Sequence, residues 1–66
     1  MKNKIKIQRA IYNLTQDDLA KRIGVSRQTI NTMESAKYIP STVLALKLAK
    51  ELKIPVEELF QLEKHD

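Results

Sequence analysis

The sequence predicts one all-α domain built from five short helices, and three observations support this fold class. Apolar residues recur mostly at helical spacings of three and four, and a Ser or Thr stands where three of the helices should begin. The single glycine comes directly after one of these apolar repeats, where a helix can end. The 66 residues contain no internal repeat and no low-complexity segment, so residues 1–66 are expected to form a single domain.

The first helix is predicted over residues 4–12. One apolar face is formed at helical spacing by Ile7, Ala10 and Ile11. Leu14 is expected to pack just beyond the end of this helix. Isoleucines alternate with lysines over residues 4–7, which is typical of a strand, so the first three or four residues remain open to an extended conformation.

The middle of the chain is predicted to form a helix-turn-helix pair. Thr15 is expected to cap the second helix, with Asp18 in the place of the Glu of a capping box. Gly24 can take the positive φ that ends this helix, and Ser26 can cap the third helix, expected over residues 27–34. The side chains expected to hold the pair together are Leu19, Ala20, Ile23, Val25, Ile30 and Met33.

A fourth helix is predicted over Thr42–Leu52, after a loop over residues 35–40. Pro40 disfavours a helical conformation at the residue before it, and Ser41 can cap the new helix. The apolar stripe that makes this the main core helix consists of Leu44, Ala45, Leu48, Ala49 and Leu52.

Pro55 fits the first position of a short fifth helix, in which Leu59 and Phe60 turn inward. The remaining residues 61–66 are too few for a further helix and are open to an extended conformation.

Positive charge is concentrated in the first 40 residues. The whole chain has a net charge of +4, of which residues 1–40 carry +5 and residues 41–66 carry −1. The basic part contains the helix-turn-helix pair, and phosphate neutralisation supplies most of the non-specific affinity of proteins for nucleic acid. One interpretation is therefore a polyanionic partner, and the other is that the lysines keep a small domain soluble.

Several function classes lack the residues they need. There is no nucleophile with a neighbouring base, no glycine-rich phosphate loop and no cysteine, so no enzyme activity, metal, cofactor or small-molecule ligand is expected. Asp17 and Asp18 suit the positive end of a helix dipole rather than a metal site. The longest apolar run, Val43–Leu46, is four residues. No membrane span or signal peptide is thus expected, and a cytoplasmic location follows.

Four side chains of the third helix are suited to contact DNA bases. If Ile30 and Met33 face the core, the side chains left outward are Arg27, Gln28, Asn31 and Thr32. Glutamine can pair with adenine through two hydrogen bonds, and arginine can pair with guanine in the same way. Because Arg27 lies at the start of the helix, it is as well suited to contact a phosphate as to contact a base. The alternative interpretation of Gln28 is that it is an ordinary exposed helix-forming residue with no contact to DNA.

The segment TQDDLAKRIGVSRQTINTMES is followed by KYIPS and by LALKLAKEL. These segments, in this order and at this spacing, resemble the Cro/C1-type, or XRE, family of helix-turn-helix DNA-binding proteins over nearly the whole chain. Compact members with a P-x-E-x-x-F terminus similar to Pro55–Phe60 are the most alike. The resemblance implies a lambda-repressor-like, five-helix domain that binds double-stranded DNA, and a homodimeric transcriptional regulator, commonly a repressor at a palindromic operator. It also implies a two-stranded sheet that joins the Met1–Lys4 region to Gln61–Glu63.

Contacts with the DNA backbone are expected from Gln16, Ser26, Thr29, Lys37, Tyr38 and Arg9. Gln16 matches the family's glutamine at the start of the second helix, which approaches a phosphate. Lys37 and Tyr38 match loop positions that often meet the backbone, although Tyr38 is equally suited to cover the edge of the core. For Arg9 the alternative is a solvated helix face. The family often has glycine or asparagine where Ser35-Ala36 stands here, and an alanine is strained in a left-handed conformation.

A homodimer is expected because a single copy reads only about one half-site. The apolar residues most available for a dimer interface are Leu46, Leu59, Phe60 and Leu62. The alternative function is a protein-interaction module, such as an antitoxin or coactivator-type domain, because the fold alone does not decide function. The polar, basic side of the third helix favours DNA over such a partner.

Overall fold

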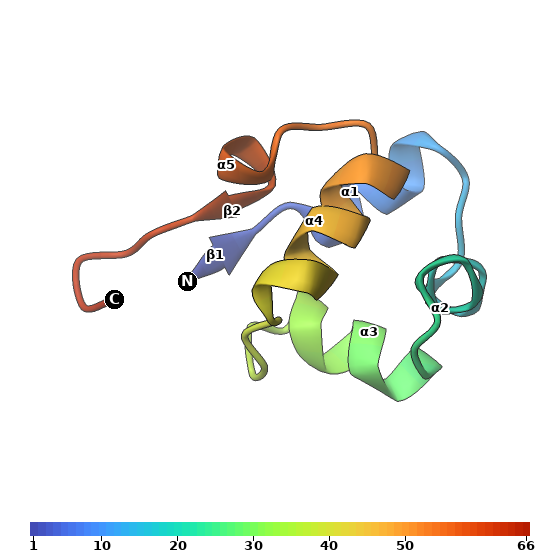
Figure 1. Cartoon of the computed structure of the whole chain (residues 1–66), viewed down its shortest axis with the longest axis horizontal. Helices are drawn as coiled ribbons and strands as arrows, with labels where there is room; N and C mark the ends of the chain where they lie inside the picture. Colours follow the sequence, from blue (N-terminus) through green and yellow to red (C-terminus); the bar gives the residue numbers. More distant parts are fainter.

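The computed structural model describes all 66 residues and contains five helices and a short two-stranded sheet (Figure 1). In chain order the elements are β1 (Lys2–Asn3), α1 (Ile5–Ile11), α2 (Gln16–Ile23), α3 (Arg27–Glu34), α4 (Thr42–Glu51), α5 (Val56–Leu59) and β2 (Phe60–Gln61). The predicted helical fold class is confirmed, and α1, α3 and α4 begin and end within one residue of their predicted limits. None of the helices has the length and apolar character needed to cross a membrane.

The core consists of hydrophobic side chains alone, since no polar or charged residue is buried. α4 packs against both α2 and α5, and Leu48 and Leu52 are fully buried. Each fully buried leucine stabilises the fold by about 1.5–3 kcal/mol, so the predicted stripe of α4 contributes substantially to hydrophobic stability. The buried residues are Ile5, Leu14, Leu19, Ala20, Ile23, Ile30, Met33, Leu48, Ala49, Leu52 and Leu59.

α1 turns a different face to the core from the predicted one. Ile5 is its only buried residue, whereas Ile7 and Ile11 are 63% and 60% exposed, and Ala10 is exposed as well. The prediction that these three residues form the packing face of the helix is therefore wrong.

Polar contacts hold the inner face of α1 in place. The Nε2 amide of Gln8 donates to the carbonyl oxygen of Leu52 at the end of α4, at 3.1 Å. Arg9 forms an ion pair with Glu34 of α3. These directional contacts fix the rotation of the helix about its own axis. The spacing of apolar residues points to the wrong face of α1, because a hydrophobic pattern takes no account of the polar contacts of Gln8 and Arg9.

Three helices begin at the predicted caps. Thr15 and Asp18 form a capping box, with Asp18 N donating to Thr15 Oγ1 and Thr15 N donating to Asp18 Oδ2, both at 3.0 Å. The hydrogen bond from the Thr15 N–H, followed by a smaller contribution from the Thr15 hydroxyl, lowers the pKa of the Asp18 carboxyl below its usual value. The hydroxyls of Ser26 and Ser41 likewise accept the backbone N–H groups of α3 and α4. Pro55 differs slightly from its prediction, because it precedes α5 with an extended ψ of 144°.

Four helices end through a residue with positive φ, and only one of these is glycine. Asn13, Gly24, Ala36 and Lys53 follow α1, α2, α3 and α4 with φ between 53° and 75°. The residue after each one donates its N–H to a carbonyl oxygen five positions earlier, as Lys37 does to Thr32 at 3.0 Å. Ala36 thus adopts the left-handed conformation, at a strain of about 1–2 kcal/mol.

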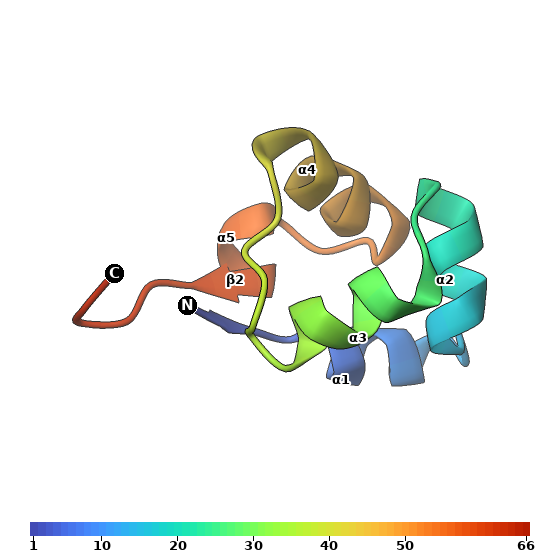
Figure 2. The same ribbon diagram turned by 90° about the horizontal axis from the view of Figure 1, so that it is seen from below.

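The two end segments of the chain pair as a two-stranded sheet, as the resemblance implies, with Lys2 opposite Gln61 and Asn3 opposite Phe60 (Figures 1 and 2). The sheet is antiparallel, and its second strand begins at Phe60, a residue predicted for the fifth helix, and ends before Leu62. Asn3 ties this sheet to the helices. Its Nδ2 donates to the carbonyl oxygen of Met33 in α3 at 2.8 Å, and its Oδ1 accepts the Ile5 N–H at 3.1 Å. The sheet therefore anchors the C-terminal end of α3.

Candidate nucleic-acid interface

α3 is held by an apolar side and presents a polar one. Ile30 and Met33 are 0% and 1% exposed, as predicted, while Arg27, Gln28 and Asn31 are exposed. At about 100° per residue, Gln28 lies on the side of the helix opposite the two buried residues. Figure 2 shows α3 running across the near side of the molecule, with no other helix in front of it.

Gln16 of α2 joins this polar side. Its side chain, together with Arg27, Gln28 and Asn31, lines a polar pocket of about 320 Å³ that has no hydrophobic lining residue. The pocket brings together three predicted base-reading residues and one predicted phosphate contact. A concave surface with amide and guanidinium donors suits the donor and acceptor groups along a DNA groove.

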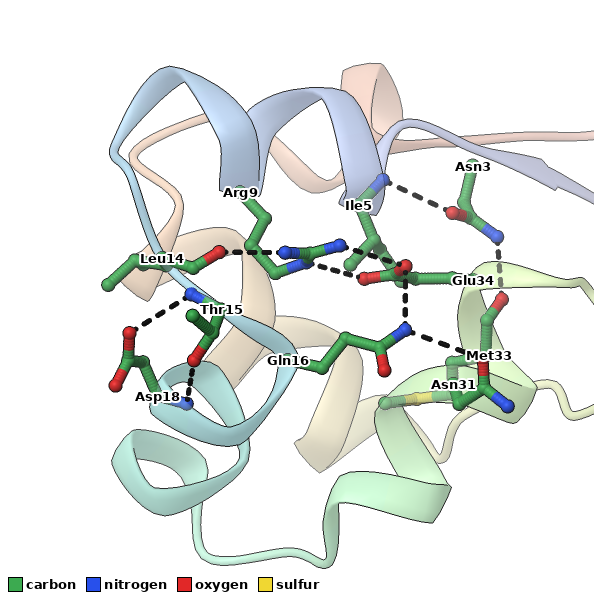
Figure 3. A network of polar contacts seen from close by, with 10 residues as sticks. All are labelled: Asn3, Ile5, Arg9, Leu14, Thr15, Gln16, Asp18, Asn31, Met33 and Glu34. Atoms are coloured by element: carbon green, nitrogen blue, oxygen red, sulfur yellow. Dashed lines mark hydrogen bonds and ion pairs between the residues drawn. The ribbon is translucent and has the colours of Figure 1, made fainter.

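A network of polar contacts fixes Gln16 (Figure 3). Its Nε2 donates to Glu34 Oε1 at 3.2 Å and to Asn31 Oδ1 at 3.4 Å. Because both acceptors belong to α3, these contacts connect the start of α2 to the third helix. The side-chain oxygen of Gln16 (Oε1) and the side-chain nitrogen of Asn31 (Nδ2) make no hydrogen bond within the chain, so both atoms remain open to a ligand.

Arg9 lies beside this pocket, in a second polar depression that Gln16 and Asn31 also line, and it is hydrogen-bonded within the chain. Its Nε donates to Glu34 Oε2 at 2.8 Å, and its Nη1 donates to the Leu14 carbonyl oxygen at 2.8 Å. The side chains of Arg9 and Glu34 are only 16% and 7% exposed. Arg9 therefore holds the fold together and is less suited to the expected phosphate contact, since Glu34 neutralises its charge and three of its five N–H groups are used within the chain.

Thr32 also departs from its prediction. The residue is half-buried, and its hydroxyl lies within hydrogen-bond distance of the carbonyl oxygens of Gln28, at 3.1 Å, and Thr29, at 3.0 Å. A threonine hydroxyl has one proton, and this proton is directed to the helix backbone. Thr32 is therefore poorly suited to donate a hydrogen bond to a base, although its methyl group is still suited to an apolar contact.

The other residues predicted to contact the backbone surround α3. Ser26 and Thr29 lie at its start, where the Ser26 hydroxyl accepts the Thr29 N–H at 3.1 Å and also bonds the Thr29 hydroxyl at 2.9 Å. Lys37 and Tyr38 lie in the loop after the helix and are exposed, directly after the left-handed Ala36. Both ends of α3 thus carry groups suited to phosphates.

The predicted dimer residues fall into two groups. Leu46 and Leu62 are exposed and Phe60 is half-buried, whereas Leu59 is fully buried in the core. Leu59 is therefore wrong as an interface residue: it is the only fully buried side chain of α5, and this burial attaches the short helix to the core. Val43, three positions before Leu46 on α4, is exposed as well.

The exposed leucine of α4 borders an apolar depression. This depression has a volume of about 330 Å³ and is lined mainly by hydrophobic side chains. Its lining residues include Met1, Ile39, Pro40, Leu46, Val56 and Phe60. The sequence pattern does not predict this depression as a whole, because its lining residues come from the N-terminus, from residues 39–46 and from residues 56–60.

Comparisons with known proteins agree with this geometry. Residues 5–59 match the model of a family described as helix-turn-helix. An HTH-type transcriptional regulator of Methanocaldococcus jannaschii is 57% identical over 60 residues, which are 91% of each chain. The regulator YgzD of Bacillus subtilis, also described as HTH-type, is 41% identical over the full length of both chains. The crystal structure of the restriction-modification controller protein C.AhdI from Aeromonas hydrophila superposes with a TM-score of 0.78 and 33% identity, covering 86% of each chain.

Proposed function

This chain belongs to the helix-turn-helix family, as its resemblance to the Cro/C1-type proteins predicts, and we propose that it regulates transcription by binding a palindromic operator as a homodimer. It is a DNA-binding regulator rather than an enzyme. The observation that carries the proposal is the polar pocket in which Gln16, Arg27, Gln28 and Asn31 meet, on a helix fixed from behind by Ile30 and Met33.

We propose that α3 enters the major groove with its first turns against the bases. Gln28 reads adenine through its amide, and Asn31 contributes its free amide nitrogen to a neighbouring base edge. Arg27 contacts guanine or a phosphate. Thr32 contributes an apolar contact, such as the methyl group of thymine, in place of the hydrogen bond expected from the sequence.

The DNA backbone is contacted at both ends of α3. Gln16, Ser26 and Thr29 meet phosphates at its start, and Lys37 and Tyr38 meet them after its end. These contacts position the helix and carry no sequence information of their own. The net charge of +5 over residues 1–40 supports this assignment, since it favours a polyanion on this part of the molecule. A DNA ligand also requires the compartment that holds the genome, which in a prokaryotic cell is the cytoplasm.

The proposed homodimer forms through the exposed apolar residues of α4 and the segment after α5. Leu46, Phe60 and Leu62 supply this surface, and Val43 extends it. A two-fold dimer places its two α3 helices about 34 Å apart, which is one turn of DNA. C.AhdI is a restriction-modification controller protein, and a controller has a regulatory role of the kind proposed for this chain.

A protein-interaction module is the second candidate considered from the sequence. α3 exposes Arg27, Gln28 and Asn31 and has no exposed aromatic or large aliphatic residue. Protein-binding hot spots are rich in such residues, so the surface of α3 favours DNA.

Selection of bound duplexes from a random pool tests the proposal. A palindromic consensus whose half-sites are about 10 base pairs apart, centre to centre, is expected from the two-fold dimer. A consensus with a single half-site would contradict the homodimer but keep DNA recognition. Recovery of no consensus, with binding that depends on salt alone, would contradict base reading by α3.

A further inference from the structure

α1 carries an apolar stripe that neither the core nor the proposed DNA interface uses. Ile7 and Ile11 are about two-thirds exposed, at 63% and 60%, and the exposed Ala10 lies between them. Their spacing of three and four residues places all three on one side of the helix. A single exposed isoleucine is ordinary, but a contiguous exposed apolar stripe is the kind of surface that marks an interaction site.

The stripe lies across α1 from the DNA interface. At about 100° per residue, Ile7 and Ile11 lie roughly opposite Ile5 and Arg9 on the helix. Ile5 is buried in the core and Arg9 points to Glu34 of α3 (Figure 3). A partner bound to the stripe therefore does not need to displace DNA from α3. The stripe is also made from other residues than the proposed dimer surface on α4.

The charges that α1 and its flanking residues place beside the stripe are positive. Lys4 and Lys6 are exposed and lie on its two sides, one helical turn from Ile7 and from Ala10. At the far end of α1, the ammonium of Lys53 lies 5.4 Å from the centre of the Tyr12 ring. Residues 1–14 include no Asp or Glu, and the charge of Arg9 is neutralised by Glu34.

This pattern identifies the kind of partner. Two copies of the chain meeting at this face would bring only cations together, which disfavours self-association. A ridge of apolar residues at spacings of three and four packs well against another helix. We propose that the stripe Ile7, Ala10 and Ile11 docks an acidic amphipathic helix of a partner protein, with carboxylates that meet Lys4 and Lys6. The proposal does not depend on DNA reading by α3.

Two synthetic helical peptides of about 18 residues provide the probe. Both carry leucines on one face, and the other positions are rich in glutamate in one peptide and in lysine in the other. Binding to the full chain is followed by backbone and methyl chemical shifts. We expect the glutamate-rich peptide to shift the signals of Ile7, Ala10 and Ile11, and to bind about tenfold or more tightly than the lysine-rich one.

Matched variants separate this surface from the rest of the molecule. Ile7→Gln with Ile11→Gln should weaken binding of the glutamate-rich peptide by about tenfold or more, while Ile39→Gln, at an exposed isoleucine of the loop before α4, should leave it unchanged. Lys4→Glu with Lys6→Glu should reverse the preference between the two peptides. The far-ultraviolet circular dichroism spectra of all variants should remain helical, and the peptide should still bind in the presence of saturating operator DNA.

Several results would overturn the proposal. These are no shift at millimolar peptide, equal binding of both peptides, or shifts centred on Leu46 and Phe60 instead of α1. Shifts of Ile7 and Ile11 that appear on concentrating the protein alone would show that a second copy covers the stripe. Equal shifts with anionic lipid vesicles and no peptide preference would assign the stripe to a membrane surface.

Discussion

Arg9 of α1 and Glu34 of α3 form an ion pair at 2.8 Å that is largely withdrawn from solvent. Glu34 also accepts a hydrogen bond from Gln16 at 3.2 Å, so one carboxylate connects the first three helices (Figure 3). The pair lies beside the polar pocket, and Glu34 helps to set the position of Gln16, a proposed DNA contact. Glu34 therefore contributes both to the stability of the fold and to the position of a proposed DNA contact.

Glu34→Gln should lower the free energy of unfolding by about 3 kcal/mol, because it leaves the partly buried Arg9 without its counter-charge. Urea unfolding measures the difference. Glu51→Gln is the matched control, because its pair with Arg22 is longer, at 3.6 Å, and more exposed. That change should cost less than about 1 kcal/mol. Equal losses in the two variants would contradict a special role for the pair of Arg9 and Glu34.

Gln28→Ala should weaken operator binding by about 1–3 kcal/mol and leave the fold intact, because the side chain is exposed and pairs with a base only in the complex. Titration of the selected operator at fixed salt measures the loss. Gln61→Ala, at the exposed glutamine of β2, is the control and should bind as the parent does. Unchanged affinity of Gln28→Ala would remove this residue from base reading.

Ala36→Gly should raise the free energy of unfolding by about 1 kcal/mol, since glycine adopts a φ of 60° without the strain of a Cβ atom. The same substitution at Ala10, an exposed position inside α1, should lower it by about 1 kcal/mol. Thermal or urea unfolding of both variants gives the comparison. The idea fails if the two changes have the same sign.

Leu46→Glu should convert the proposed dimer to a monomer, because it places a charge in the apolar surface of α4. Sedimentation of the parent and the variant at high micromolar concentration measures the assembly. Lys47→Glu, the adjacent exposed residue, controls for added negative charge and should keep the dimer. A monomeric parent chain at that concentration would contradict the dimer itself.

Asp18 should make the domain more stable above about pH 4 than below it. Its carboxylate accepts the Thr15 N–H at 3.0 Å, and this hydrogen bond, with a smaller contribution from the Thr15 hydroxyl, holds its pKa below the usual 3.8. A lowered folded-state pKa adds stability above the unfolded value, and this stability is lost as pH falls through the folded value. Urea unfolding of the parent and of Asp18→Ala between pH 2 and pH 7 measures the effect. The difference between them should shrink on acidification, and a constant difference would be the contrary result.

The helix starts and the core could be predicted because local chemistry determines them. Thr15, Ser26 and Ser41 each satisfy backbone N–H groups of the helix they precede, which requires only nearby residues. The apolar stripe of α4 is equally predictable, because its helical spacing continues from Leu44 to Leu52, over more than two turns. The end of a helix is harder to predict. Gly24 indicates a left-handed helix end by its residue type, whereas Ala36 and Lys53 adopt the same positive φ although alanine and lysine do not favour it.

Most departures from the expected positions have the same cause, which is that contacts between distant segments decide them. Arg9 lies 25 residues from Glu34 in sequence, and nothing in either local segment identifies its partner. The burial of Leu59 depends on how α5 meets the core, and the rotation of α1 depends on Gln8 and Arg9 together. Thr32 is a local exception, since a hydroxyl inside a helix can bond the carbonyl oxygens of the preceding turn.

Three of the four positive-φ helix ends carry side chains, and this leaves the protein with room for thermostabilisation. For a domain of this size, each kcal/mol of added stability raises the melting temperature by about 4–8 °C. Lys53 and Ala36 terminate different helices, so relieving both should give nearly additive gains. Lys53 also lies outside the polar pocket, which makes it a position where an engineered, more heat-resistant regulator need not trade away operator affinity.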